Sequence, residues 1–137
     1  MSTPEVPTPA GVVRYLLPGD WRVFAGKTDA ANEELSLRFA RPRDLWFHIH
    51  GLPGSHVVLQ VPEGREPEKR TVELAASVAA YHSKARAAGT VAVSCTEARH
   101  VSKPRGAKPG TVAITRERMI KTRPATDELI AAWRVPG

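Results

Sequence analysis

The chain has 137 residues, 42% of them hydrophobic and 25% charged, which is typical of one globular domain with its own core. It has no run of about 18 apolar residues, which excludes a transmembrane helix, and its single cysteine, Cys95, excludes an internal disulfide and a cysteine-rich zinc site. The net charge of +6 favours a polyanionic partner. Because the first residues show neither the basic nor the apolar region of a signal peptide, we expect a cytoplasmic protein.

The basic charge is concentrated in the later part of the chain. Residues 99–123 hold eight Lys and Arg and one acid, a net charge of +7, so the remaining residues are close to neutral. The eight basic residues are Arg99, Lys103, Arg105, Lys108, Arg116, Arg118, Lys121 and Arg123. Such a concentration indicates a phosphate-binding surface, with a solvated basic hairpin as the alternative.

In chain order, the first predicted elements are a tail, a strand and a helix. Residues 1–10 are rich in proline and threonine, which predicts a disordered tail. Aromatic and β-branched residues over 21–26 predict a short strand. Thr28 or Asp29 can cap a helix that runs to about Ala40, although apolar alternation in its second half leaves a strand open there.

The middle of the chain predicts two strands and the longest helix. Strand-forming residues occupy 44–49 and 56–61, with a Gly/Pro turn over 51–54 between them. The Ala-rich segment 65–88 has helical apolar spacing, and Gly89 follows it as a C-cap.

The last predicted elements are strands over 90–95, 111–115 and 119–121 and a short helix over 127–133. This order of elements predicts a single α+β domain over residues 11–137. We expect one mixed, mainly antiparallel sheet, with the long Ala-rich helix and one or two shorter helices packed on it.

Four motifs, in the same order, resemble a known family. They are Asp-Leu-Trp-Phe-His at 44–48, Pro-Gly-Ser-His-Val-Val at 53–58, the end of the Ala-rich helix at 81–86, and Lys-Pro-Arg-Gly-Ala-Lys-Pro-Gly at 103–110. With these motifs the chain resembles the NFACT-R domain over roughly residues 20–124. That domain is the predicted RNA-binding module of the NFACT proteins, which act in ribosome-associated quality control.

The resemblance implies RNA or ribosome binding by a stand-alone NFACT-R protein, without a metal. It does not imply the tail-elongating activity of the full-length members. One strand departs from the family pattern, since residues 93–96 read Val-Ser-Cys-Thr where the family usually has Val-Asp-Tyr-Thr. The departure removes an acid and an aromatic residue just before the basic segment.

Alternate residues on the strand at 44–49 form the first candidate binding site. Asp44, Trp46, His48 and His50 share one face of this strand. Trp46 could stack on an unpaired base, His48 and His56 could donate to phosphates or base edges, and Asp44 could orient His48 or accept from a base. The alternative is structural, with Trp46 covering a helix and its neighbours forming hydrogen bonds.

The segment 103–110 is the second candidate binding site. Its prolines and glycines preclude a helix, so Lys103, Arg105 and Lys108 can straddle phosphates. Other residues that we expect to extend this surface are Ser55, Lys84, Arg86 and Arg99. Lys84 and Arg86 could instead complement the dipole at the end of the helix.

Two kinds of chemistry compete with RNA binding. His48, His50 and His56 could form a zinc site, and Asp44 with His48 could act as a base and its orienting group in phosphodiester cleavage. We expect neither a metal nor a cofactor, and we expect no catalytic residue and no membrane partner. The favoured function is binding of tRNA or rRNA, with the ribosome as a further partner. The alternatives are a ribosome-associated protein adaptor and, after that, a metal-independent RNA-processing enzyme.

Overall fold

The computed structural model describes residues 7–136. Most of the predicted tail, residues 1–6, lies outside the described residues, and residues 7–9 adopt neither helix nor strand. Within residues 7–136, every helix is too short or too polar to cross a membrane.

The fold is built on a six-stranded sheet in which all neighbouring strands are antiparallel. In spatial order the strands are β1 (Val12–Leu17), β2 (Trp21–Gly26), β4 (Val57–Leu59), β3 (Leu45–Ile49), β5 (Val91–Glu97) and β8 (Arg118–Thr122). A second, two-stranded sheet pairs β6 (Val101–Ser102) with β7 (Ala113–Ile114). The predicted α+β class and the mainly antiparallel sheet are confirmed.

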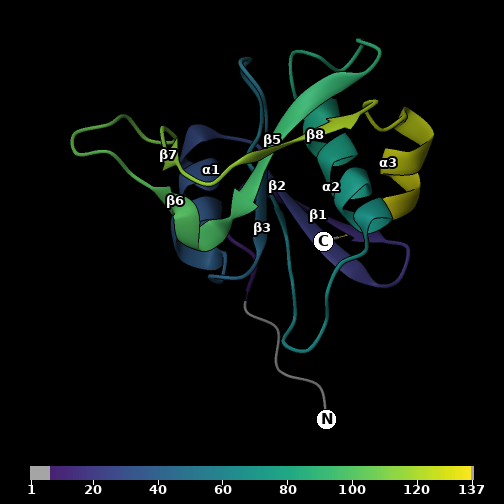
Figure 1. Ribbon diagram of the computed structural model, residues 1–137, viewed down its shortest axis with the longest axis horizontal. Coiled ribbons are helices and arrows are strands. Elements are labelled where there is room, and N and C mark those ends of the chain that lie inside the picture. The colour runs from purple at the N-terminus through teal and green to yellow at the C-terminus, as the bar shows by residue number, and fades with distance from the viewer. Residues whose placement is uncertain (1–6, 137) are drawn as a thin grey trace.

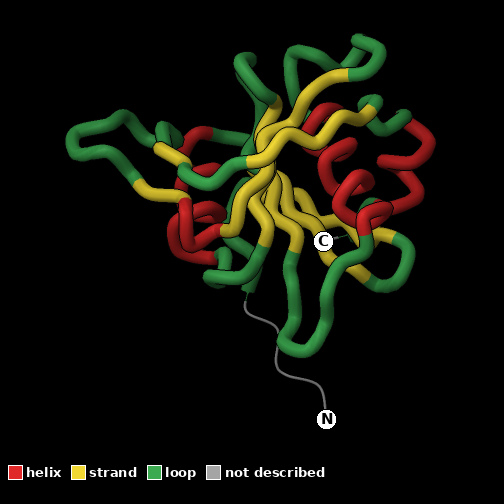
Figure 2. The backbone as a smooth tube through the Cα atoms, in the orientation of Figure 1, coloured by secondary structure: helices red, strands yellow, loops and turns green. Residues whose placement is uncertain are grey.

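Helices cover both faces of the large sheet (Figure 1). On one side lie α2 (Lys69–Tyr81) and α3 (Asp127–Trp133), and on the other lie α1 (Asp29–Glu34), a π-helical turn η1 (Leu35–Phe39) and a short 3-10 turn η2 (Ala98–His100). Figure 2 shows the same division, with strands between the two groups of helices.

The alternation along β3 divides the interior into two cores. Phe47 and Ile49 join the larger core beneath α2, whereas Trp46 joins a smaller core with Leu35 of η1 and Val58 of β4. Because successive side chains of a strand point to opposite faces, the face that carries Trp46 is buried as well.

Helix α2 is shorter at both ends than the predicted helix over 65–88. It begins at Lys69 and ends at Tyr81, so Gly89 is not its C-cap. After Tyr81 the chain pairs with the turn that follows β3: Gly54 bridges to Ser83, and the Ser55 N–H donates to the His82 carbonyl at 2.9 Å. Backbone pairing with a distant turn therefore replaces the last two turns of the predicted helix.

Other elements also differ from the sequence prediction. Neither η2 nor β6 was predicted, and the strand predicted over 111–115 is reduced to β7. The helix predicted over 28–40 is α1 followed by η1, with Thr28 as its N-cap through a 3.0 Å bond from the Ala31 N–H. Strand β1 was not predicted, although every second residue from Val13 to Leu17 is buried. That alternation was the available signal for β1.

Candidate nucleic-acid interface

Three aromatic rings form a cluster on the sheet face beneath η1. In this histidine cluster, Trp46 stacks on His48 with centroids 6.0 Å apart, and His56 stands edge-on to both rings at 5.2 and 5.6 Å. Trp46 is 3% exposed and His56 is 5% exposed, whereas His48 is half-buried. The cluster is therefore a packed interior that presents only His48 at its rim.

A single hydroxyl connects the cluster to η1. The Trp46 indole N–H donates to Ser36 Oγ at 2.9 Å, and that oxygen lies 2.7 Å from Nδ1 of His56. Because an indole can only donate, Ser36 accepts from Trp46, and the same hydroxyl is hydrogen-bonded to the His56 ring. The His56 ring also interacts with the Gly110 backbone. The cluster thus reaches the end of the basic segment.

The basic loop, residues 103–110, projects beside α1 between β6 and β7 (Figure 1). Both of its ends are held by Glu33 of α1. Lys103 Nζ lies 3.0 Å from Glu33 Oε1, and the Gly110 N–H donates to the same oxygen at 3.2 Å. These two bonds hold the pKa of the Glu33 carboxyl below its ordinary value. Lys103 therefore anchors the loop.

The tip of the basic loop is open to solvent. Arg105 and Lys108 are exposed, and neither forms an ion pair with another residue of the described chain, 7–136. At the loop's end, Gly110 has a φ of 84°, and a Cβ there would lie 3.1 Å from the Asp29 carbonyl oxygen. Glycine is needed at this position because the chain both turns and approaches α1 closely.

A second basic surface lies beside the turn at 51–55. This depression, the turn groove, is lined among others by Lys27, Ser55, Lys84 and Arg86. The Lys84 N–H donates to the Pro53 carbonyl at 3.1 Å, which holds the turn against the segment that follows α2.

Arg86 has a fixed position at the far side of the turn groove. Its guanidinium lies 4.0 Å from the centre of the Tyr81 ring, and its Nε donates to the Tyr81 carbonyl at 2.7 Å. Its remaining N–H groups can still reach a ligand, because the side chain is exposed.

Helix α1 brings these parts together. Asp29 and Asn32 line the turn groove, and the Asn32 side chain accepts from the His56 N–H at 3.0 Å. The next residue, Glu33, holds the basic loop. The histidine cluster, the basic loop and the turn groove therefore surround one short helix, although they lie far apart in the sequence.

Asp44 and Arg99 lie apart from this surface. Asp44 is 2% exposed, and its carboxylate accepts from the Val61 N–H at 2.9 Å and the Arg41 N–H at 2.8 Å. Burial raises the pKa of this carboxyl. Arg99 lies in a separate pocket and pairs with Glu97 at 2.8 Å.

His50 does not join the other two histidines. Its Nδ1 lies 3.3 Å from the Ser94 hydroxyl oxygen, and its ring is exposed. Within residues 7–136, no three His, Cys, Asp or Glu side chains are grouped so that they could hold a metal ion.

Sequence reasoning did not single out Lys27 or Arg43 as binding residues. Lys27 joins the turn groove because the connection between β2 and α1 faces the turn at 51–55. No local motif marks such a residue, and only the tertiary pairing of the turn would reveal it.

The buried histidines predict a loss of stability in acid. Burial lowers the pKa of His56 to about 4, with a further contribution from nearby His48, and burial likewise lowers the pKa of His82 to about 4. Both rings take up protons more readily in the unfolded chain, so their contribution is fully present above about pH 6.5 and is lost as the pH falls towards 4. We expect the free energy of unfolding to fall by up to about 3 kcal/mol per histidine across this window.

Urea unfolding at several pH values measures this effect. A His56→Gln variant should show a flatter dependence than the parent between pH 6.5 and 4, whatever its stability at neutral pH. An identical slope in the two proteins would contradict a depressed pKa at His56.

The fold and this basic, histidine-containing surface define a small α+β domain suited to polyanions, and comparison with known families agrees. Residues 12–116 match the model of the NFACT protein RNA binding domain. Because the match covers most of the chain, the protein belongs to this family, as the motifs at 44–48, 53–58 and 103–110 predicted.

The relatives are longer proteins. The chain is 41% identical over 108 residues to the protein named Rqc2 homolog RqcH of Bacillus subtilis. The matched region covers 79% of this chain and 18% of the relative. It is 37% identical over 117 residues to the Rqc2 homolog RqcH of Streptococcus suis, covering 85% of this chain and 21% of the relative. The chain thus spans about a fifth of the length of these curated relatives.

A solved structure shares the fold. The C-terminal part of the fibronectin/fibrinogen-binding protein of Streptococcus suis superposes with a TM-score of 0.85 at 32% identity. The match covers 96% of this chain and 52% of that one.

Proposed function

We propose that the protein binds structured RNA through one continuous surface around α1, formed by the basic loop, His48 and the turn groove. The observation that carries the proposal is the double anchoring of the loop: Lys103 and Gly110 both bind Glu33, while the Gly110 backbone meets His56. This anchoring holds both ends of the loop beside α1, so Arg105 and Lys108 at its tip extend from a fixed base.

The charges of this surface suit a phosphate backbone. Lys27, Lys84, Arg105 and Lys108 are exposed and form no ion pair within the described residues 7–136. Glu33 lies on the same surface, but Lys103 already neutralises it. Four unpaired cations around one helix can therefore contact successive phosphates.

The half-buried His48 adds a polar contact that does not depend on charge. Burial lowers its pKa, so the ring is neutral at pH 7 and has one donor and one acceptor, and it also interacts with the backbone of Ile49 and Gly54. We propose that His48 bonds a base edge or a 2′-hydroxyl, while Asp44, Trp46 and His56 hold β3 and β4 in place beneath it. Ser55 lies in the turn groove, where its hydroxyl can bond the RNA backbone.

The RNA that we propose is tRNA or rRNA, in the context of ribosome-associated quality control. The support is membership of the NFACT RNA-binding family together with relatives named Rqc2 homolog RqcH. No catalytic role is assigned, because the buried carboxylate of Asp44 bonds to backbone N–H groups.

Binding to purified tRNA and to a structured rRNA fragment across a salt series tests the proposal. Four neutralised phosphates predict a log–log slope of about −3 to −4 against salt. A slope near zero, or no binding at low salt, would overturn it. Capture of ribosomes that survives nuclease treatment would instead indicate a protein partner.

A further inference from the structure

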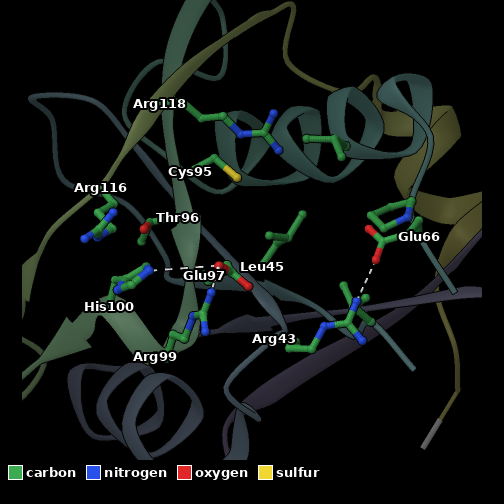
Figure 3. A pocket seen from close by; sticks show the side chains of 13 residues that line it. Arg43, Leu45, Glu66, Cys95, Thr96, Glu97, Arg99, His100, Arg116 and Arg118 are labelled. Atoms are coloured by element: carbon green, nitrogen blue, oxygen red, sulfur yellow. Dashed lines mark hydrogen bonds and ion pairs between the residues drawn. The ribbon is translucent and has the colours of Figure 1, made fainter. Parts of the chain in front are cut away.

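A second basic pocket lies where β8 leaves β5, away from the histidine cluster (Figure 3). It has a volume of about 630 Å³, within the range of small-molecule sites. Its lining includes four arginines and two glutamates, a net charge of +2: Arg43, Arg99, Arg116, Arg118, Glu66 and Glu97.

Two of these arginines are already paired. Arg43 binds Glu66 at 2.7 Å, and Arg99 binds Glu97 at 2.8 Å. Arg116 and Arg118 form no ion pair within residues 7–136, and Figure 3 shows the Arg118 side chain extending from β8 over Cys95. Because Arg118 uses only part of its donor set on Cys95, the pocket retains the guanidinium of Arg116 and the remaining N–H groups of Arg118 for an external anion.

The inner wall of the pocket is apolar. Leu45, Val72 and Cys95 line it, and all three belong to or pack against the larger core. Burial raises the pKa of the Cys95 thiol to about 11, so the thiol is uncharged at neutral pH, and the Arg118 side chain hydrogen-bonds to it. A flat, uncharged group can lie against this wall while a charged group meets the rim.

We propose that this pocket binds a nucleotide, with Arg116 and Arg118 holding its phosphate and the apolar wall at Leu45 and Val72 receiving its base. The nucleotide is either free or unstacked from RNA, since both present the same chemistry. Arginine forks match phosphate oxygens in pairs and also stack on bases.

A nucleotide fits the pocket better than an acidic peptide does. Glu66 and Glu97 stand on the same rim, so a peptide with several carboxylates would meet like charge. A nucleotide carries its charge at one end only. The site is distinct from the basic loop, so this proposal stands even where the RNA-binding proposal fails.

Arg116 can be replaced by glycine to test the pocket without disturbing the backbone. It has a φ of 55°, in the left-handed region where glycine is favoured over other residues. Arg116→Gly therefore removes the guanidinium without demanding a strained backbone, and we expect no loss of thermal stability. Arg118→Gln, at an exposed position on an edge strand, is the second variant.

The experiment is titration of the isotope-labelled protein with AMP, followed by NMR, with adenosine and inorganic phosphate as separate probes. We expect AMP to shift amide signals of Cys95, Thr96 and Arg118, and we expect adenosine to bind at least about tenfold more weakly. Each variant should lower the affinity for AMP at least about tenfold. Arg105→Gln in the basic loop should leave the affinity for AMP unchanged.

The RNA affinity of the same variants shows whether the pocket binds a free nucleotide or a nucleotide unstacked from RNA. Loss of both AMP and RNA affinity shows that the pocket takes a nucleotide of the RNA, and loss of AMP alone shows a free nucleotide. AMP that fails to bind at millimolar concentration, or that binds both variants as tightly as the parent, would overturn the proposal. Loss of RNA affinity confined to Arg105→Gln would support the proposed function independently of this pocket.

Discussion

Trp46→Ala is expected to lower the free energy of unfolding by about 3–5 kcal/mol. The indole is 3% exposed and packs with Leu35 and Val58 in the smaller core. Its removal leaves a cavity and also deprives Ser36 of the proton that it accepts at 2.9 Å. Urea unfolding at neutral pH measures the loss.

Trp46→Phe is the matched variant, because it retains an aromatic ring in the core while it removes the N–H and part of the indole volume. It should cost about 1–3 kcal/mol, less than Trp46→Ala, and preserve RNA affinity once the protein is folded. If Trp46→Phe folded normally but bound RNA much more weakly than the parent, the indole would be a contact residue, and the supporting role that we propose for it would be wrong.

The double variant Arg105→Gln/Lys108→Gln is expected to weaken RNA binding by about 10- to 100-fold at moderate salt. It should also reduce the steepness of the salt slope by about 2, because two phosphate contacts are lost. Both side chains are exposed at the tip of the basic loop, so stability should be unchanged. Fluorescence anisotropy with labelled tRNA across a salt series measures both quantities.

The charge-matched control is Lys121→Gln/Arg123→Gln, which removes the same charge from exposed positions at the end of β8 and just beyond it. Because these residues lie away from α1, we expect the RNA affinity of this control to depend on salt as steeply as that of the parent. Equal weakening by the two double variants would mean that net charge, rather than the basic loop, determines affinity.

Much of the fold follows from local pattern. The alternation over residues 44–49 predicted β3 and which residues share each of its faces, although not the burial of Trp46, and Thr28 predicted the start of α1. The end of α2 at Tyr81 was not predictable, because it results from pairing between Ser83 and Gly54 across the fold. Helical spacing in residues 82–88 is a weaker influence than that pairing.

The candidate site shows the same limit. Its residue types were visible in the sequence, but the sequence could not show that the basic loop and the histidines lie on one surface. That depends on Glu33, which binds both ends of the loop from an otherwise ordinary helix. Nor could strand alternation show that the Asp44 carboxylate accepts hydrogen bonds from the backbone N–H groups of Val61 and Arg41.

NMR chemical-shift mapping with a small structured RNA shows where on the protein the RNA binds. We expect perturbed amides in four segments that surround α1: residues 27–29, 50–55, 84–86 and 103–110. These segments should shift together over one titration curve, because they form one surface. Shifts confined to α3 and β8, with the basic loop unaffected, would contradict the account.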